Sequence, residues 1–225
     1  MSSIQDRKAR YDGVADWYDT YAVPTPQTLT ALGALVGEGP GLALDLGCGT
    51  GLYLDYLSSR GFEVVGIDLS MDQLRLARGR WPEVVCADGS HLPLGTASVD
   101  LVAAIWVSTD FDDPAAVLGE VARVLRPGGH LVTFGVHPCF NGPFVENLDD
   151  GSRLVHPGYR EGGWYHDAPW WGDGIRRRAG MRHVPLAELF NTMIGAGLQV
   201  EHVVEPRDEP VPFILGVKCS LASRP

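Results

Sequence analysis

The segment Leu42–Leu52 constrains the fold of this chain most strongly. It is a short apolar run that carries Asp45 near its end and is followed by Gly47, Gly49 and Gly51 at alternate positions. Glycines lack a Cβ, so backbone and ligand can approach closely. A helical pattern begins directly afterwards, and the amides that open such a helix face whatever lies beyond the strand. At the carboxyl end of the first strand of an open parallel sheet, a turn of this kind is typical of a nucleotide site.

Two more apolar segments, 63–68 and 83–88, each end in an acid, Asp68 and Asp88. A carboxylate at the end of the second strand can accept hydrogen bonds from ribose hydroxyls. The glycine spacing is tighter than the dinucleotide fingerprint, and no Lys-Ser/Thr pair is present to bind phosphate. These features disfavour an NAD-linked reductase and indicate a different nucleoside-containing ligand.

Strand and helix patterns alternate along the first 136 residues. Strands are predicted at 42–46, 63–68, 83–88, 99–106 and 130–136, and helices at 26–36, 52–61, 70–80 and 113–125. Alternation of this kind requires parallel pairing with right-handed crossovers. A helix at 185–195 and two final strands at 198–204 and 212–220 follow, so residues 1–225 are expected to form one α/β domain.

Four segments together resemble the class I S-adenosylmethionine-dependent methyltransferases. They are residues 44–51, 66–70, 87–93 and 125–129, in the order and spacing of that family. The resemblance implies a Rossmann-like, seven-stranded, mostly parallel sheet with helices on both faces and the last two strands as an antiparallel pair. It also implies S-adenosylmethionine as cofactor and methyl transfer as the activity.

The resemblance assigns roles to several residues. Asp68 would bind the ribose and Asp88 the adenine amino group, while the Gly47 carbonyl would meet the methionine ammonium. Asp45 would order the turn, and adenine would lie between Leu69 and Val107. The remaining predicted cofactor-binding residues are Tyr18, Cys48, Gly49, Gly51, Gly89 and Ile105.

Residues 1–37 are predicted to form N-terminal cap helices. In the methyltransferases that this chain resembles, a Tyr-Asp segment often closes over the methionine part of the cofactor, which favours Tyr18 ahead of Tyr11. The alternative is an aromatic segment that only packs on the edge of the domain.

Residues 138–183 contain no long periodic run but are rich in aromatic side chains, including Trp164, Trp170 and Trp171. Long loops in compact domains are usually functional or disordered, and the aromatics argue against disorder. We therefore predict an acceptor lid inserted after the fifth strand, with a small satellite core as the alternative. The run Arg176–Arg178 is most simply a solvated face, and binding of an anionic acceptor group is the minor alternative.

Two residues are candidates for the general base that an oxygen or carbon acceptor would need. Asp110 follows the fourth predicted strand and His137 ends the fifth, where open parallel sheets place their ligands. An imidazole can accept a proton near neutral pH. Each residue also has a purely structural alternative, helix capping for Asp110 and local backbone bonding for His137. Many family members carry His-His after the fourth strand, where this chain has Val107-Ser108-Thr109.

Composition narrows the class of partner. The net charge is −10, which disfavours nucleic acid because phosphate neutralisation needs a basic surface. The four cysteines are far apart and the histidines irregularly spaced, so no metal site is expected. With no apolar run of transmembrane length and no signal-peptide core, a cytoplasmic monomer or homodimer without a membrane partner is expected.

The predicted function is methyl transfer to a small-molecule acceptor, most simply an aromatic or hydrophobic metabolite. The alternative is a protein that keeps the fold and the cofactor without transferring methyl, either as a cyclase-like enzyme or as a regulatory binder.

Overall fold

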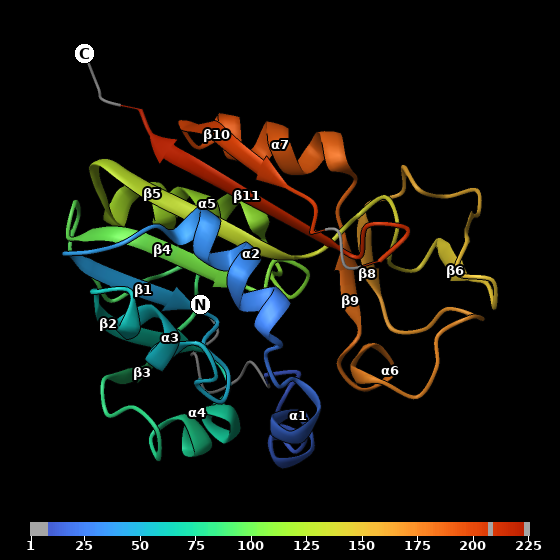
Figure 1. Cartoon of the computed structure of the whole chain (residues 1–225), viewed down its shortest axis with the longest axis horizontal. Coiled ribbons are helices and arrows are strands. Elements are labelled where there is room, and N and C mark those ends of the chain that lie inside the picture. The colour runs from blue at the N-terminus through green and yellow to red at the C-terminus, as the bar shows by residue number, and fades with distance from the viewer. Residues whose placement is uncertain (1–8, 207–208, 223–225) are drawn as a thin grey trace.

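A seven-stranded sheet forms the centre of the molecule (Figure 1). The computed structural model describes residues 9–206 and 209–222. The strand order is β10-β11-β5-β4-β1-β2-β3. The strands are β1 (Leu42–Leu46), β2 (Glu63–Asp68), β3 (Val84–Cys86), β4 (Val99–Ile105), β5 (Leu125–Val136), β10 (Leu198–Val204) and β11 (Ile214–Leu221).

The first five strands pair in parallel, whereas β11 runs antiparallel to both β5 and β10. The strand β11 therefore runs opposite to the other six strands of this sheet. The predicted fold is confirmed, including the antiparallel pairing of the last two strands.

Helices cover both faces of the sheet, as predicted. The helices α2 (Pro26–Val36), α3 (Leu54–Ser59) and α4 (Met71–Ala77) pack on one face, and α5 (Pro114–Val124) and α7 (Leu186–Gly195) on the other. The strand β4 shows why both faces need cover. Its residues Leu101 and Ala103 belong to one core cluster and Val102 and Ala104 to the other, and all four are buried. Alternation along a strand sends successive side chains to opposite faces.

Local capping signals set the starts of three helices. The side chains of Thr25, Ser70 and Asp113 accept hydrogen bonds from the backbone N–H groups three residues ahead, at 3.2, 3.2 and 3.0 Å. Such bonds satisfy amides that have no partner inside the helix. The helices α2, α4 and α5 therefore begin where their sequences predict.

The structure departs from the predicted boundaries at two strands. The strand β5 begins at Leu125 rather than at residue 130, because the pairing with β4 moves from Val99–Leu125 to Leu101–His130. The intervening residues bulge outward, and Gly128 takes a φ of +79° there. The strand β3 is shorter than predicted, since it pairs only with the last three residues of β2.

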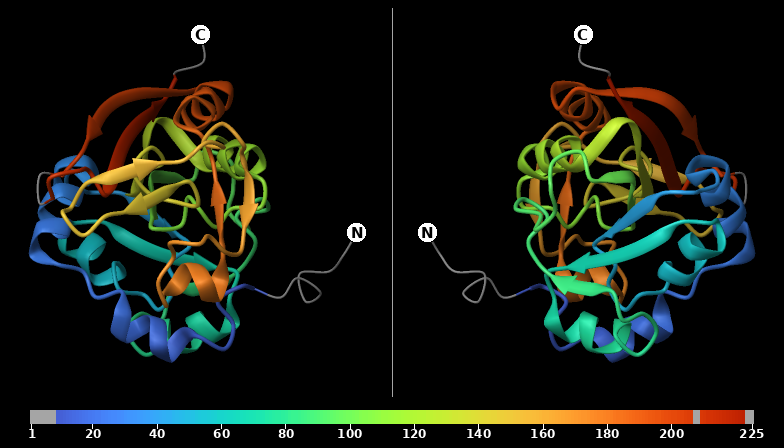
Figure 2. Two further views of the ribbon diagram at one scale, coloured as in Figure 1. Left: turned by 90° about the vertical axis from the view of Figure 1, so that its right-hand side faces the viewer. Right: turned by 90° about the vertical axis from the view of Figure 1, so that its left-hand side faces the viewer.

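Residues 138–183 form a small layer of their own beyond the carboxyl end of β5 (Figure 2). Two antiparallel pairs, β6–β7 and β8–β9, are accompanied by one short helix. The elements are β6 (Val145–Asn147), β7 (Arg153–Val155), β8 (Gly163–Tyr165), α6 (Ile175–Ala179) and β9 (Met181–His183). Elements of three to five residues are too short to produce a periodic pattern, which is why the sequence shows none.

The N-terminal segment lies against α4. Its helix α1 (Ala15–Tyr21) follows a turn in which the Gly13 N–H donates to the Asp72 carboxylate at 2.9 Å, and Arg75 pairs with Asp16. Of the predicted cap at 1–37, residues 1–8 lie outside the described part of the chain. Among the helices of the described ranges, none has the length and apolar character needed to span a membrane.

We predict that Phe134→Ala will lower the free energy of unfolding by about 3–5 kcal/mol, because it leaves a cavity in a closed core. Phe134 lies on β5 with no exposed side-chain surface and meets the Trp106 ring edge-on at 6.0 Å between centroids. Urea unfolding measures the loss. Val203→Ala, at a position on β10 that is 44% exposed, is the control and should cost less than about 1 kcal/mol. Equal losses in the two variants would contradict this view of the core.

Candidate active site

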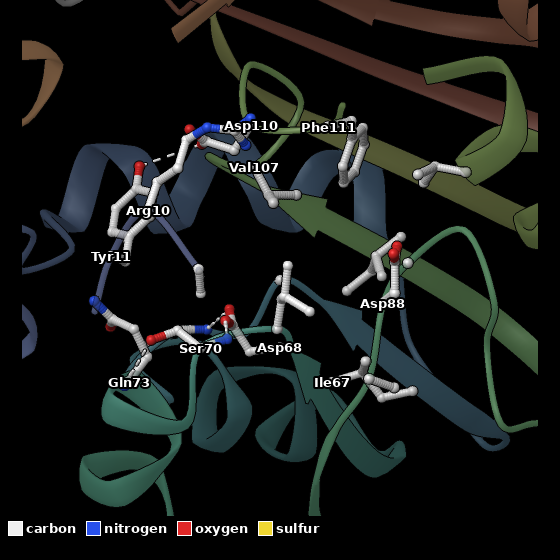
Figure 3. A pocket seen from close by; sticks show the side chains of 18 of the residues that line it. Arg10, Tyr11, Ile67, Asp68, Ser70, Gln73, Asp88, Val107, Asp110 and Phe111 are labelled. Carbon is white, nitrogen blue, oxygen red and sulfur yellow. Dashed lines mark hydrogen bonds between the residues drawn. The ribbon is translucent and has the colours of Figure 1, made fainter. Parts of the chain in front are cut away.

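A cavity opens at the carboxyl ends of β1, β2 and β4 and is the candidate active site (Figure 3). The sheet brings these strand ends together because the strands are parallel neighbours. Ten of the fourteen predicted site residues line the cavity: Tyr18, Gly47, Gly49, Asp68, Leu69, Asp88, Gly89, Ile105, Val107 and Asp110. Sequence positions spread over nearly a hundred residues thus meet around one space.

The glycine turn is shaped so that only glycine fits its first position. Gly47 has a φ of +73°, and a Cβ there would lie 2.3 Å from Cγ2 of Val107. The Asp68 carboxylate fixes the turn through hydrogen bonds to backbone N–H groups. Its Oδ2 accepts from the Gly49 N–H at 2.9 Å and its Oδ1 from the Ser70 N–H at 2.7 Å. Burial raises the pKa of Asp68, and these amide bonds oppose the rise.

Buried polar atoms without partners lie next to this turn. Within the described residues, Asp45 Oδ2 and both amide atoms of the Gln73 side chain have no hydrogen-bond partner. Each side chain belongs to a residue that is only 1% exposed. Burial raises the pKa of Asp45 to about 8, and the nearby Asp68 carboxylate adds to the shift. Buried polar atoms are normally satisfied, so the neighbourhood of the glycine turn suits a polar ligand.

Acidic side chains lie at both ends of the cavity, Asp88 at one and Asp110 at the other. Figure 3 shows Asp88 across the space from Tyr11. Asp88 Oδ1 accepts from the backbone N–H and the hydroxyl of Ser90, at 2.9 and 2.8 Å. This bonding holds the carboxylate at the end of the cavity beyond β3.

Asp110 forms a second acidic centre, near the N-terminal segment. Its Oδ2 accepts from the Tyr11 hydroxyl at 3.3 Å, and Arg176 Nη1 lies 3.5 Å from its Oδ1. Burial raises the pKa of Asp110 to about 6, although the Arg176 charge and the Tyr11 bond act to lower it. Burial and the Asp110 charge raise the pKa of Tyr18 well above its usual range. With its pKa raised in this way, the Asp110 carboxylate can accept a proton near neutral pH.

The structure places His137, the other predicted base, outside the residues that line this cavity. The His137 side chain is buried, and its ring packs on Phe140. Its Nδ1 accepts from the Cys139 N–H at 3.1 Å, and its Nε2 lies 2.9 Å from Glu205 Oε1. Both ring nitrogens thus have partners at the base of the 138–183 insertion.

Three predicted cofactor residues also lie outside the lining. Asp45 is the buried acid described above. Cys48 is buried against β2, where a Cβ on Gly66 would lie 2.8 Å from its Sγ. Gly51 faces Ala77 of α4, because a Cβ on Gly51 would come within 3.3 Å of that residue. The last two positions support the turn by close packing.

Several lining residues were not predicted from the sequence, among them Arg10, Gln73 and Trp106. Trp106 has a φ of +62°, an uncommon conformation for a bulky residue, and its Nε1 donates to the Tyr53 hydroxyl at 2.7 Å. Arg10 pairs with Asp112 and lies over the ring of Trp164 at 3.5 Å. A search for residues just after the fourth strand would have found Trp106, but no local signal marks Arg10.

Metal-binding side chains are not grouped together in the part of the chain that the structure describes. In residues 9–206 and 209–222, no three His, Cys, Asp or Glu side chains are close enough to hold an ion.

Comparisons with known proteins agree with this geometry. A family model described as a methyltransferase domain matches residues 44–133. A demethylmenaquinone methyltransferase of Renibacterium salmoninarum is 32% identical over 148 residues, which are 60% of this chain and 61% of that protein. The chain spans about half the length of the curated relatives it matches.

Solved structures extend the similarity over the whole fold. An S-adenosylmethionine-dependent methyltransferase from Mesorhizobium loti is 27% identical, with a TM-score of 0.69 over 93% of this chain and 99% of that one. The cyclase SpnF shares the fold at 18% identity, with a TM-score of 0.66 over 95% of each chain. The four motifs, the sheet and these similarities support the resemblance of this chain to the class I S-adenosylmethionine-dependent methyltransferases.

Proposed function

We propose that this protein transfers the methyl group of S-adenosylmethionine to a small-molecule acceptor with an aromatic or hydrophobic body. One observation carries the proposal. The glycine turn, Asp68, Asp88 and the acidic centre at Asp110 line a single cavity at the carboxyl edge of the sheet. The groups predicted to bind the cofactor and a candidate base therefore line the same cavity.

The residues around the glycine turn fit the cofactor that the family uses. Asp68 would hold the ribose, Asp88 the adenine, and the turn at Gly47 the methionine part. The unpartnered atoms of Asp45 and Gln73 support this assignment, because S-adenosylmethionine carries both an ammonium and a carboxylate near its sulfur. The ammonium would offset the cost of ionising Asp45.

Methyl transfer from a sulfonium is an in-line displacement on a donor that is already activated. The protein then contributes orientation and a water-poor cavity. Tyr11, Tyr18 and Val107 line the cavity around the candidate base. An acceptor oxygen or carbon must also lose a proton, and we assign that proton to Asp110, whose carboxylate faces the cavity. His137 remains the alternative base.

The acceptor class is supported by two observations. Demethylmenaquinone methyltransferases are among the relatives, and Trp164 of the 138–183 insertion lies against Arg10, which lines the cavity. The competing function is cofactor binding without methyl transfer, and a cyclase with the same fold illustrates it. Incubation with a methyl-labelled donor and a library of aromatic metabolites, followed by mass spectrometry, separates the two. A labelled product supports transfer, whereas tight donor binding with no labelled product across the library favours the alternative.

Asp68→Ala should weaken binding of S-adenosylhomocysteine by about 1–3 kcal/mol, because charge-assisted hydrogen bonds are lost. Titration calorimetry measures the change. Asp68→Asn keeps the size of the side chain and should lose less. Asp16→Ala, at a position with a side chain 79% exposed and paired with Arg75, is the control and should bind as the wild type does. Unchanged affinity in Asp68→Ala would remove this residue from the site.

Asp45→Asn should stabilise the cofactor-free protein while weakening cofactor binding. In the folded chain this carboxyl keeps its proton up to about pH 8, whereas in the unfolded chain it releases it near its usual pKa. Ionisation therefore costs stability as the pH rises through this window. The neutral amide avoids that cost, so the advantage of the variant should grow by about 1 kcal/mol per pH unit. Urea unfolding at about pH 5 and about pH 8 tests this, and a difference independent of pH would contradict it.

Asp110→Asn should lower kcat by about 10²–10⁴-fold and leave affinity for S-adenosylhomocysteine unchanged. The wild-type rate should rise with pH through about 6, where Asp110 loses its proton, and this limb should be absent in the variant. His137→Ala is the matched comparison and should lose less than about tenfold. If the large loss and the missing limb appear in His137→Ala instead, His137 is the base.

A further inference from the structure

A second, open cavity of about 310 Å³ lies between α1, the end of β5 and the 138–183 insertion. Four of its fifteen lining residues are aromatic, namely Tyr21, Trp170, Trp171 and Phe213. A volume of this order accommodates a small organic ligand. In the views of Figures 1 and 2, α6 lies beside α1 at this place, and Arg178 of α6 lies 4.4 Å above the Trp17 ring of α1.

The three consecutive arginines of α6 have different environments. Arg177 and Arg178 are at the surface and pair with Asp167 and Asp173, at 2.9 and 3.1 Å. Arg176 lines the second cavity, and its side chain is only 19% exposed. The expectation of one solvated face therefore holds for two of the three arginines and is wrong for Arg176.

The guanidinium of Arg176 is only partly used. Its hydrogen bonds to the described residues are made by Nη1 alone, to Asp110 Oδ1 at 3.5 Å and to the Gly180 carbonyl at 3.4 Å. Both distances are at the long limit for a hydrogen bond. An arginine guanidinium can bind a planar carboxylate through two N–H donors at once. The Nε and Nη2 donors of Arg176 are therefore available to a stronger anionic partner.

The position of Arg176 connects this cavity to the candidate active site. Asp110, its ion-pair partner, lines the cofactor cavity. Trp106 of the cofactor cavity and Phe213 of the second cavity also meet, at 6.3 Å between ring centroids. A ligand in the second cavity would thus lie directly against the wall that carries the candidate base.

We propose that the second cavity binds the acceptor, and that this acceptor is a flat aromatic compound bearing a carboxylate that pairs with Arg176. Trp170 supports the aromatic part, because this residue lines the cavity and offers a flat apolar ring to a ligand. Asp173 also lines the cavity, but its side chain is 82% exposed and paired with Arg178. Arg176 is therefore the cation that a bound carboxylate would meet. This inference rests on the proposed function, to which it adds the class of acceptor.

Two matched probes, 2-naphthoate and 2-naphthamide, test the proposal on the whole chain saturated with S-adenosylhomocysteine. At neutral pH, we expect the wild type to bind the carboxylate at least about tenfold more tightly than the amide. Arg176→Gln should remove this preference by weakening naphthoate binding about tenfold or more. Arg177→Gln, on the same helix, is the control: its Nε donates to the Trp171 carbonyl at 2.8 Å, but it does not line the cavity, so the preference for the carboxylate should be unchanged.

Two additional measurements keep the result interpretable. Arg176→Gln also unpairs Asp110, so the comparison is repeated in an Asp110→Asn background, where repulsion by an unpaired carboxylate is absent. If Arg176→Gln does not fold, the wild-type preference and Trp170→Leu decide, and Trp170→Leu should weaken both probes equally.

The proposal is overturned if the wild type binds the two probes equally, if naphthoate does not bind up to about 10 mM, or if Arg177→Gln acts as Arg176→Gln does. Failure of the wild type to bind S-adenosylhomocysteine would instead contradict the proposed function. Normal binding of S-adenosylhomocysteine without a carboxylate preference would contradict only the acceptor class.

Discussion

The hydrogen bonds accepted by Asp68 organise the candidate site. One oxygen binds the Gly49 N–H in the glycine turn after β1, and the other binds the Ser70 N–H at the start of α4. Ser70 in turn caps α4 through its hydroxyl. A single carboxylate thus fixes the turn, the helix start and the end of β2 relative to one another, and the cavity takes its shape between them.

This arrangement has a cost that the sheet core offsets. Asp45 and Asp68 are both acids in a buried environment, and burial raises the pKa of each. The amide of Gln73 is buried without a partner in the described chain, and Trp106 holds an unfavourable φ of +62°. Unfavourable features of this kind persist where the surrounding structure is well packed, as it is on both faces of β4. Their concentration around one cavity is what a ligand site would require.

Two segments far apart in the chain complete the site, one with a hydrogen bond and the other with a charge. The N-terminal segment contributes Tyr11, and the insertion contributes Arg176, and both contact Asp110. Burial raises the pKa of Asp110 to about 6, and these two neighbours limit the rise. The pKa of the candidate base is therefore modulated by groups located 99 and 66 residues away. Any ligand that competes for Arg176 would alter the proton affinity of Asp110, which couples the two cavities.

The sequence by itself determined the sheet and its helices, and nine of the twelve residues that it predicts for cofactor binding line the candidate active site. Local sequence predicts these features. Strands and helix caps follow from the periodicity and type of neighbouring residues, and the positive φ of Gly47 is possible because glycine has no Cβ. Only the tertiary structure distinguished Asp110 from His137, whose ring nitrogens contact Cys139 and Glu205. It alone separated Arg176 from the two arginines that follow it. The physical reason is that burial, ion pairing and cavity lining depend on segments that are far apart in the sequence. The elements of the insertion are also too short to show a hydrophobic period from which their packing could be predicted.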